Sequence, residues 1–307
     1  MTAPDAPLFS VIVPTRARLT QLRRCLDALA GQQYPRDDFE VIVVNDGSPP
    51  LPAEELAAFA GRLTLRSIDQ PWGGPATARN TGIRHARGRW IAFTDDDCAP
   101  VPDWLASFAR QLEAHPEALV GGHVCNALEH DPYATASQLL VDYLYAYHAR
   151  ARSRGPAFFT SNNFAGAADT VRTLGGFDAG FSLPAGEDRD FCDRWQATGA
   201  PLHYCAEAEV RHFHAMTLRA FTRQHYRYGR GAWTFHSARV QRGSGPRRFE
   251  PFAFYSGLVT YPLRVMRGPQ ALVPLALLCW SQVVNAYGYF DEWRRHTSGP
   301  ARRPFIT

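Results

Sequence analysis

Three consecutive carboxylates, Asp95, Asp96 and Asp97, follow the apolar run Arg89–Thr94. Adjacent carboxylates repel one another unless a cation neutralises them. Hard oxygen ligands suit Mg²⁺ or Mn²⁺, and Mg²⁺ is typically held by one or two carboxylates together with substrate phosphates. An acidic turn or a helix N-cap would also accommodate the triplet. Its place after a buried strand favours a divalent metal site.

Two other apolar runs also end in polar residues. The run Glu40–Val44 leads into Asn45-Asp46-Gly47-Ser48, and the run Phe9–Val13 leads into Pro14-Thr15-Arg16. The Asp46 carboxylate is suited to accept hydrogen bonds from a ribose or from a base N–H. The same four residues would also form an ordinary Asx turn.

The stretch Gly73–Gly82 is rich in small residues and opens a predicted helix. Small residues at Gly73 and Gly74 permit close backbone approach, and a helix N-terminus favours anions. Arg79 lies one turn into this helix, within reach of a phosphate. The alternative is an ordinary capped surface helix. The stretch lacks the GxGxxG spacing, so a dinucleotide fingerprint is absent.

The first third of the chain alternates predicted strands with predicted helices. The strands are Phe9–Val13, Glu40–Val44, Leu63–Ile68 and Arg89–Thr94, and the helices are Leu19–Leu29 and Pro75–Ala86. This alternation indicates βαβ units and a mostly parallel, Rossmann-like α/β sheet flanked by helices. Ligands of such sheets bind beyond the carboxyl ends of the strands. The three polar strand ends are therefore expected on one edge, where they form one site.

The rest of the chain is more mixed. Helices are predicted at Trp104–Leu112, Ser137–Arg150, Arg189–Ala197 and Leu218–Trp233, strands at Ala118–Cys125 and His203–Val210, and a strand or loop at Phe158–Ala167. A linker at Gly243–Arg248 precedes two apolar stretches, Pro251–Leu263 and Gly268–Phe290. We therefore expect an α/β domain over residues 1–242 and a basic, apolar, helical C-terminal extension over residues 243–307.

Composition excludes several mechanisms. Lysine does not occur in the sequence, and all 33 basic residues are arginines. P-loop phosphate binding, Schiff-base chemistry and kinase-type catalysis, which depend on a lysine, are therefore excluded. Six scattered cysteines without a CxxC pair predict reduced thiols, and a zinc site built on them is not expected. Met1–Pro7 has no features of a secretory signal, which favours a cytoplasmic location.

Charge is distributed unevenly along the chain. Residues 1–210 contain 18 arginines and 26 acidic residues, whereas residues 211–307 contain 15 arginines and 3 acidic residues. A basic C-terminal region can contact nucleic acid, anionic lipid or phosphates. Because the sequence has no zinc finger or RNP-type motif, a nucleic-acid partner is not expected.

Six strings together indicate a family. They are FSVIVPTRAR, EVIVVNDGS, GGPATARNTGIRHARGRWIAFTDDDC, LGGFD, GEDRDFCDRW and RQHYRYGRG, in that order, over about residues 8–235. The chain resembles the family-two glycosyltransferases with a GT-A fold. The resemblance implies an inverting, metal-dependent enzyme that takes a sugar from a UDP-, GDP- or dTDP-sugar.

The resemblance also assigns roles to residues. It implies donor contacts at Pro14, Thr15, Arg16, Asp46, Gly74, Arg79, Asp95 and Asp96, with Asp95 and Asp97 forming the DxD element that binds Mn²⁺ or Mg²⁺ and His212 completing the metal shell. It implies that Asp188, in Gly186-Glu187-Asp188, is the catalytic base, and it places Gly176, Phe177 and Glu187 in an acceptor or loop region. An inverting transfer does need one carboxylate to take the proton of the acceptor hydroxyl.

Several assignments have alternatives. Glu187 or Asp188 would also serve as a helix-start carboxylate that satisfies the helix dipole. His214 shares a strand face with His212 and is either a further ligand or an ordinary histidine. The helix carrying Arg223, Gln224, Arg227 and Arg230 lies either near the diphosphate or acceptor or on a membrane.

Two other functions compete with sugar transfer. A sugar-nucleotide pyrophosphorylase would need an N-terminal Gly-rich loop ending in lysine, and this chain has Val13-Pro14-Thr15-Arg16 at that position. A non-catalytic sugar-nucleotide binding module would not need the acidic residues at Asp95, Asp97 and Asp188.

The last apolar stretch, Gly268–Phe290, has 23 uncharged residues, and a spanning helix needs about 20. Pro274 lies inside it, and arginines and aromatic residues surround it. These features predict peripheral attachment, or a shallow hairpin, on the anionic inner face of the cytoplasmic membrane. The acceptor would then be lipid-linked or a cell-envelope glycan. The alternative is a tail that covers its own core or forms a dimer.

Overall fold

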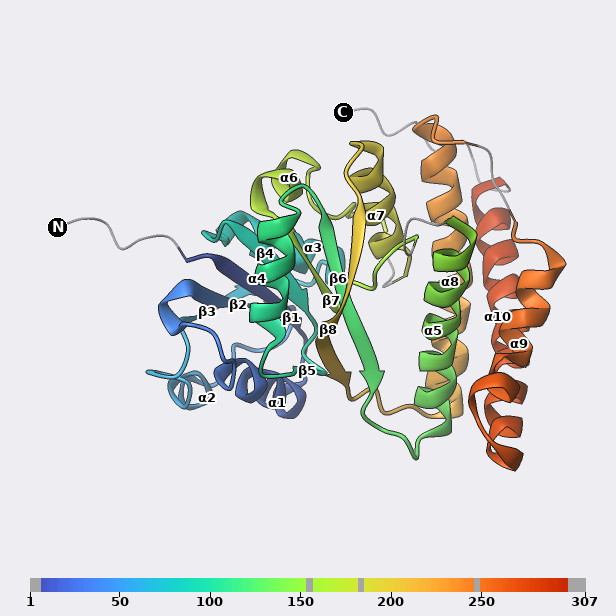
Figure 1. Cartoon of the computed structure of the whole chain (residues 1–307), viewed down its shortest axis with the longest axis horizontal. Helices are drawn as coiled ribbons and strands as arrows, with labels where there is room; N and C mark the ends of the chain where they lie inside the picture. The colour runs from blue at the N-terminus through green and yellow to red at the C-terminus, as the bar shows by residue number, and fades with distance from the viewer. Residues whose placement is uncertain (1–6, 153–156, 182–184, 246–248, 298–307) are drawn as a thin grey trace.

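A mixed eight-stranded sheet forms the centre of the molecule (Figure 1). The structure, a computed structural model, describes residues 7–152, 157–181, 185–245 and 249–297. The strands are β1 (Phe9–Thr15), β2 (Phe39–Asp46), β3 (Leu65–Gln70), β4 (Trp90–Thr94), β5 (Cys98–Pro100), β6 (Leu119–Asn126), β7 (Asn163–Ala167) and β8 (Leu202–His212). Their order across the sheet is β3-β2-β1-β4-β7-β6-β8-β5.

Most of the strands run in the same direction. Strands β3, β2, β1 and β4 pair in parallel, as do β6 and β8, whereas β7 runs antiparallel to β4 and β6, and β5 runs antiparallel to β8. The predicted mostly parallel α/β sheet is therefore confirmed. Thr15 pairs with Asn45 in the register of β1 with β2, so these two strands end together at one edge, as expected.

Alternation of apolar residues along the strands divides the interior into two cores. In β1, Val11 and Val13 face one core and Ile12 faces the other, because successive side chains of a strand point to opposite faces. The first core is covered by α1 (Leu19–Ala30) and α4 (Trp104–Ala114). The second is covered by α3 (Pro75–His85), α6 (Ala168–Thr173) and α7 (Glu187–Ala197).

Four helices stand side by side at one end of the sheet and form a helical layer (Figure 1). They are α5 (Pro132–Arg152), α8 (Leu218–Gln241), α9 (Phe252–Val265) and α10 (Leu272–Thr297). Leu258 and Leu278, from the predicted extension, are buried in the second core. Glycines permit close contact of α8 with α10, since a Cβ on Gly288 would lie 2.1 Å from the Tyr226 carbonyl oxygen. The predicted boundary at residue 243 stays a prediction.

The structure adds elements that the sequence patterns do not reveal. The short helix α2 (Ala53–Ala57), the strand β5 and the helix α6 were not predicted, since three to six residues are too few to show a period. Two 3₁₀ turns lie at Arg36–Asp38 and Gly268–Ala271. The segment Gly268–Thr297 is long and apolar enough to cross a membrane, and 39% of its apolar window is buried in the protein.

Candidate active site

One cavity of about 1860 Å³ opens at the carboxyl edge of the sheet and continues into the helical layer. It brings together most of the predicted site residues. Its walls include Pro14, Thr15, Arg16, Asp46, Gly74, Arg79, Asp95, Asp96, Asp97, Glu187, Asp188 and His212. The cavity also includes His214, Arg223, Gln224 and Arg227, whereas Arg230 instead pairs with Glu292. The three strand ends and the start of α7 therefore face one space.

Asp97 is held by two cationic neighbours. The Nε2 atom of His212 lies 3.3 Å from its Oδ1 atom, and Nη1 of Arg18 lies 3.1 Å from its Oδ2 atom. Burial opposes ionisation, but the hydrogen bond and charge of His212, together with Arg18, hold the pKa of Asp97 below its usual range. Burial also acts on His212, yet Asp97 raises the pKa of that imidazole. The pair is a carboxylate and an imidazole that face each other across the rim of the cleft.

Asp96 lies deeper, and its environment is different. Its Oδ2 atom accepts a hydrogen bond of 2.7 Å from the Thr15 hydroxyl, and its Oδ1 atom lies 3.2 Å from Nη1 of Arg18. Burial, with the neighbouring charge of Asp97, raises the pKa of Asp96 to about 6 despite Arg18. Arg18 therefore bridges two carboxylates of the triplet. Sequence analysis did not single it out, although it belongs to the string FSVIVPTRAR.

Arg79 links the acidic triplet to the start of α7. Its Nη2 atom lies 2.7 Å from Oδ1 of Asp95, and its Nη1 atom lies 3.4 Å from Oε1 of Glu187. The residue is only 3% exposed, and its guanidinium packs over the Phe177 ring. Arg79 thus binds two carboxylates 92 positions apart in the chain. A phosphate contact by Arg79 stays a prediction.

The Asp46 carboxylate organises the loop that opens α3. It accepts hydrogen bonds from the backbone N–H groups of Gly73 and Gly74, at 2.8 and 2.9 Å, and from the Gln70 amide. Gly74 has a φ of 85°, which L side chains rarely adopt. Trp72, next to this loop, is exposed in the cleft, with the Arg16 guanidinium over its ring. Sequence analysis missed this aromatic surface.

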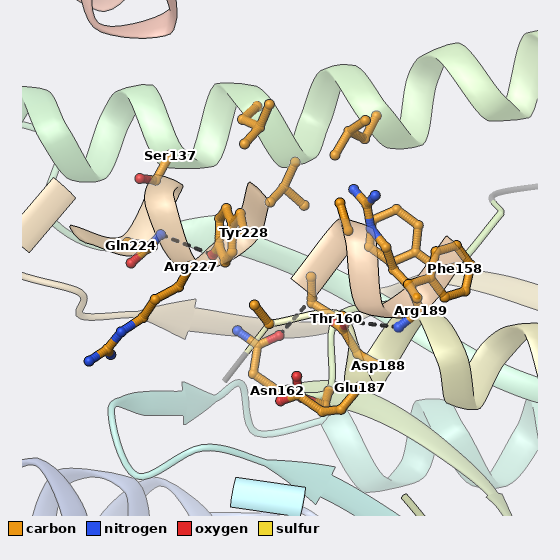
Figure 2. A pocket seen from close by; sticks show the side chains of 18 of the residues that line it. Ser137, Phe158, Thr160, Asn162, Glu187, Asp188, Arg189, Gln224, Arg227 and Tyr228 are labelled. Carbon is orange, nitrogen blue, oxygen red and sulfur yellow. Dashed lines mark hydrogen bonds between the residues drawn. The ribbon is translucent and has the colours of Figure 1, made fainter. Parts of the chain in front are cut away.

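The predicted base Asp188 and its neighbour Glu187 occupy the first turn of α7. Figure 2 shows Glu187 and Asp188 beside Thr160 and Asn162, with Tyr228 of α8 on the neighbouring wall. Burial and the adjacent Asp188 charge raise the pKa of Glu187 to about 7, although Arg79 opposes this. Burial also raises the pKa of Asp188. Two neighbouring carboxylates in a desolvated site cannot readily ionise together, which is typical of acid–base centres.

Gly176 and Phe177 are not among the residues that line the cavity, and their place in an acceptor or loop region stays a prediction. Phe177 is buried and stacks on Phe191, with the ring centroids 4.7 Å apart. Gly176 has a φ of 70° and packs against Asn80, whose amide bonds to the Phe177 backbone. These residues form a loop that supports α3 from below the site. The positive φ of Gly175 and Gly176 gives these two positions a conformational reason to be glycine.

A divalent cation fits the residues at the rim. Ligand atoms of Asp97, Cys98 and His212 lie within 4.8 Å of one another. The Cys98 thiol is fully buried, and burial raises its pKa well above the usual value, so it is protonated and a poor ligand. A carboxylate and an imidazole remain, with the half-buried Asp95 carboxylate nearby in the same wall. This donor set suits Mn²⁺ or Mg²⁺ better than a soft metal.

The sheet, its strand order and the flanking helices define an α/β domain of the GT-A type. Residues 10–169 match the family model described as glycosyl transferase family 2. Residues 90–290 match a second family model, described as glycosyl transferase family group 2. The chain belongs to glycosyl transferase family 2. The family resemblance expected from the six strings is confirmed.

Curated relatives and solved structures agree with this membership. The chain is 36% identical to the glycosyltransferase AglE of Haloferax volcanii over 121 residues, covering 38% of this chain and 40% of AglE. It is 29% identical to the pre-mycofactocin glycosyltransferase of Mycobacterium tuberculosis over 227 residues, covering 73% of this chain and 46% of that protein. This chain thus spans less than half the length of these two relatives.

The mannosyltransferase PcManGT from Pyrobaculum calidifontis, solved in complex with GDP-Man and Mn²⁺, has a similar fold. The TM-score is 0.64 at 21% identity, and the match covers 93% of this chain and 89% of that one. TarS of Staphylococcus aureus, solved in complex with UDP-GlcNAc, matches with a TM-score of 0.56 at 15% identity, over 97% of this chain and 94% of that one. Both likenesses confirm the GT-A fold expected from the sequence.

Proposed function

We propose that this protein transfers a sugar from a nucleotide diphosphate-sugar to a hydroxyl acceptor, with inversion at the anomeric carbon. The observation that carries the proposal is the shared cavity, in which the acidic triplet at the end of β4 faces the carboxylate pair at the start of α7. Family membership supports the reaction class. The relatives act on different substrates by name, so the donor base, sugar and acceptor of this chain are not inferred from them.

The chemical step is a single displacement. The acceptor oxygen bonds to the anomeric carbon as the bond from that carbon to the diphosphate oxygen breaks. The acceptor proton passes to Asp188, which lies in the cavity at the start of α7. The raised pKa of this carboxyl makes it a stronger base than an ordinary aspartate, as general base catalysis requires.

The donor would lie along the strand ends. Asp95, Asp97 and His212 would hold a divalent cation, which supplies Lewis-acid stabilisation of the departing diphosphate when bound. The ribose and base would contact Asp46 and the Thr15–Asp96 pair, which line the cavity at the sheet edge. Arg79 would keep the triplet and the α7 carboxylates in fixed relation, through its contacts with Asp95 and Glu187.

A thermal-shift panel tests the donor. UDP-, GDP- and dTDP-sugars are each added with Mn²⁺ and with EDTA, because a ligand that binds the folded state raises its stability by mass action. We expect one nucleotide class to raise the melting temperature, and only with metal. Product NMR then checks the mechanism, since retention of anomeric configuration would reject a single displacement. Donor binding without transfer or hydrolysis would favour a binding module. Formation of a nucleoside triphosphate and a sugar 1-phosphate from the nucleotide-sugar and added pyrophosphate would favour a pyrophosphorylase.

We also propose that the helical layer attaches peripherally to an anionic membrane surface, where a lipid-linked or cell-envelope acceptor would be available. Trp280, Val283 and Tyr287 of α10 are exposed by 45%, 62% and 66%. They line a groove of about 590 Å³ with Arg219 and Arg223 of α8. Aromatic side chains suit the headgroup region, and each arginine near an anionic surface contributes about 1 kcal/mol.

Flotation with vesicles tests the attachment. The full-length protein should float with phosphatidylglycerol vesicles at low salt and not with neutral vesicles, and 1 M salt should release it. Replacing Val283 and Tyr287 by serine should abolish flotation. Failure of the unaltered protein to float under any of these conditions would favour the alternative, in which the apolar face contacts a second protein chain.

A further inference from the structure

The cavity extends well beyond the space that a donor needs. Small-molecule pockets usually have about 300–1000 Å³, and this cavity has about 1860 Å³. The part next to the strand ends is polar, and the part within the helical layer, which we call the helical branch, is lined by α5 and α9. The lining side chains there include Leu140, Val141, Leu144, Phe254, Tyr255 and Leu258. The wall that α5 and α9 give to this space is therefore largely apolar.

A charged group of α7, Arg189, lies beside this apolar wall, and Arg223, Arg227 and Arg239 of α8 line other parts of the cavity. Arg189 follows the proposed base directly, and its side chain extends from α7 toward α5, past Phe158, as Figure 2 shows. The guanidinium carbon lies 4.5 Å from the centroid of the Phe158 ring. Within the described part of the chain, the Arg189 guanidinium forms no ion pair and no side-chain hydrogen bond. The Asp188 carboxylate accepts its bond from the Arg189 backbone N–H instead.

The surroundings of this guanidinium differ from those of the arginines that form ion pairs. Arg18, Arg79, Arg194, Arg239 and Arg242 each contact a carboxylate, whereas the half-buried Arg189 packs on the Phe158 ring. Burial lowers the pKa of Arg189, although Asp188 and the more distant Glu250 act in the opposite direction. Arginine stays charged in proteins. Arg189 is half-buried, and a charge that is partly removed from water without a contacting partner is stabilised when an anion meets it.

We propose that the helical branch binds the acceptor, and that the acceptor is an amphiphile with an anionic group at Arg189 and an apolar chain between α5 and α9. The inference rests on the proposed transferase function, because it assigns the acceptor of that reaction. The anion is a phosphate or a carboxylate, both of which a guanidinium binds through two parallel hydrogen bonds. The hydroxyl that attacks the sugar lies on the same molecule, next to Asp188.

Calorimetric titration of the full-length protein without donor tests the proposal. The probes are decyl phosphate, decanoate, decyl glucoside and inorganic phosphate, each below its critical micelle concentration. We expect decyl phosphate or decanoate to bind at least about tenfold more tightly than decyl glucoside or inorganic phosphate, as loss of a charge-assisted contact or of the buried chain implies. The stronger of the two anionic probes identifies the headgroup chemistry.

Variants locate the binding. Arg189→Gln should lower the affinity for the preferred anionic probe by at least about tenfold, and Arg189→Lys should retain part of that affinity. Val141→Trp should also weaken it, because Val141 is only half-buried in the branch and a larger ring would fill the space. Arg36→Gln removes an exposed charge outside the cavity and should have no effect.

Three results would overturn the proposal. Equal affinity of decyl glucoside and the anionic probes, or unchanged binding by Arg189→Gln, would reject the anion site. Unchanged binding by Val141→Trp would place the probe outside the branch. The metal-dependent thermal shift with the preferred nucleotide-sugar should persist in both variants, which shows that they fold. Absence of that shift in the unaltered protein would instead reject the proposed function, and the probe titration would still report on the branch.

Discussion

The strand-end half of the cleft and its helical half are constructed differently. In the strand-end half, polar groups lie on rigid backbone and have partners within the protein, such as Asp97 with His212 and Arg18. In the helical half, apolar side chains from α5 and α9 line the same cavity as Arg189, for which the described part of the chain provides no carboxylate partner. The first arrangement suits a fixed, charged donor with a metal. The second suits a ligand whose apolar surface and charge complete the wall.

The largest effect should come from the strand-end half. Asp97→Ala removes a carboxylate from the proposed metal site, and a Lewis acid contributes several kcal/mol to transition-state stabilisation. Since each 1.36 kcal/mol is tenfold in rate, we expect transfer to fall by about 1000-fold or more. The metal-dependent donor shift should disappear as well.

Cys98→Ala is the matched control, because Cys98 lies next to Asp97 but is buried and protonated. It should keep metal dependence and most activity. Near-normal transfer by Asp97→Ala, with EDTA harmless, would refute the metal site and remove the distinction between the two halves.

The next largest effect is expected from a substitution at Asp188, which lies where the two halves of the cleft meet. Asp188→Asn cannot take the acceptor proton, and we expect turnover to fall by about 100-fold or more. Donor affinity should stay within about twofold, since the donor binds at the strand ends rather than at α7. Transfer kinetics and the donor thermal shift check the two parts. An active Asp188→Asn beside an inactive Glu187→Gln would move the base by one position.

The strand-end half could be predicted largely from sequence, and the reason is local. Short β-branched runs stop at Pro14, at Asn45 and at Asp95, and parallel strands must end at a common edge. The positions of these strand ends in the sequence therefore indicate which side chains lie close together in the cleft. The roles of Asp46 and Asp96 as donor contacts were given only by resemblance and stay predictions.

The helical half could not be predicted in the same way. Its walls join α5 to α9, which are about a hundred residues apart, and no periodic pattern specifies which helix faces pair across that distance. Arg79 contacts Glu187 across 108 positions, and Arg18 contacts Asp96 across 78. Which residues form such distant contacts depends on the tertiary packing of the chain. The string GEDRD contains Arg189, but only the structure shows that its guanidinium enters an apolar branch.

A substitution with a smaller expected effect, on stability, tests whether the helical layer unfolds as a separate unit. Gly288→Ala places a methyl group 2.1 Å from the Tyr226 carbonyl, so α8 and α10 must move apart. Overpacking of this kind costs about 1–3 kcal/mol. We expect the urea midpoint to fall in one cooperative transition, with the donor shift retained. Urea unfolding followed by circular dichroism and tryptophan fluorescence measures this.

Gly31→Ala is the control for that change. Gly31 has a φ of −91°, and an added Cβ would meet its nearest neighbours at 3.5 and 3.6 Å, an ordinary contact distance. Its unfolding free energy should change by less than about 0.5 kcal/mol. Two separate transitions in Gly288→Ala would instead support the boundary at residue 243 as a domain boundary.

The smallest expected effect is a shift in the pH dependence of turnover, because charged residues on both sides of Asp188 influence its pKa. Since burial raises the pKa of Asp188, and Glu187 has a pKa of about 7, the base is protonated at low pH and inactive. Turnover should therefore rise with pH, by about tenfold per unit at most below the pKa. Glu187→Gln removes a like charge, which should shift this rise to lower pH. Arg189→Gln removes a charge that favours the ionised Asp188, so it should shift the rise to higher pH.

Opposite shifts, measured from turnover between pH 5 and 9 at saturating donor, would identify Asp188 as the titrating group. Shifts in the same direction, or none, would mean that turnover follows another group or a step without proton transfer.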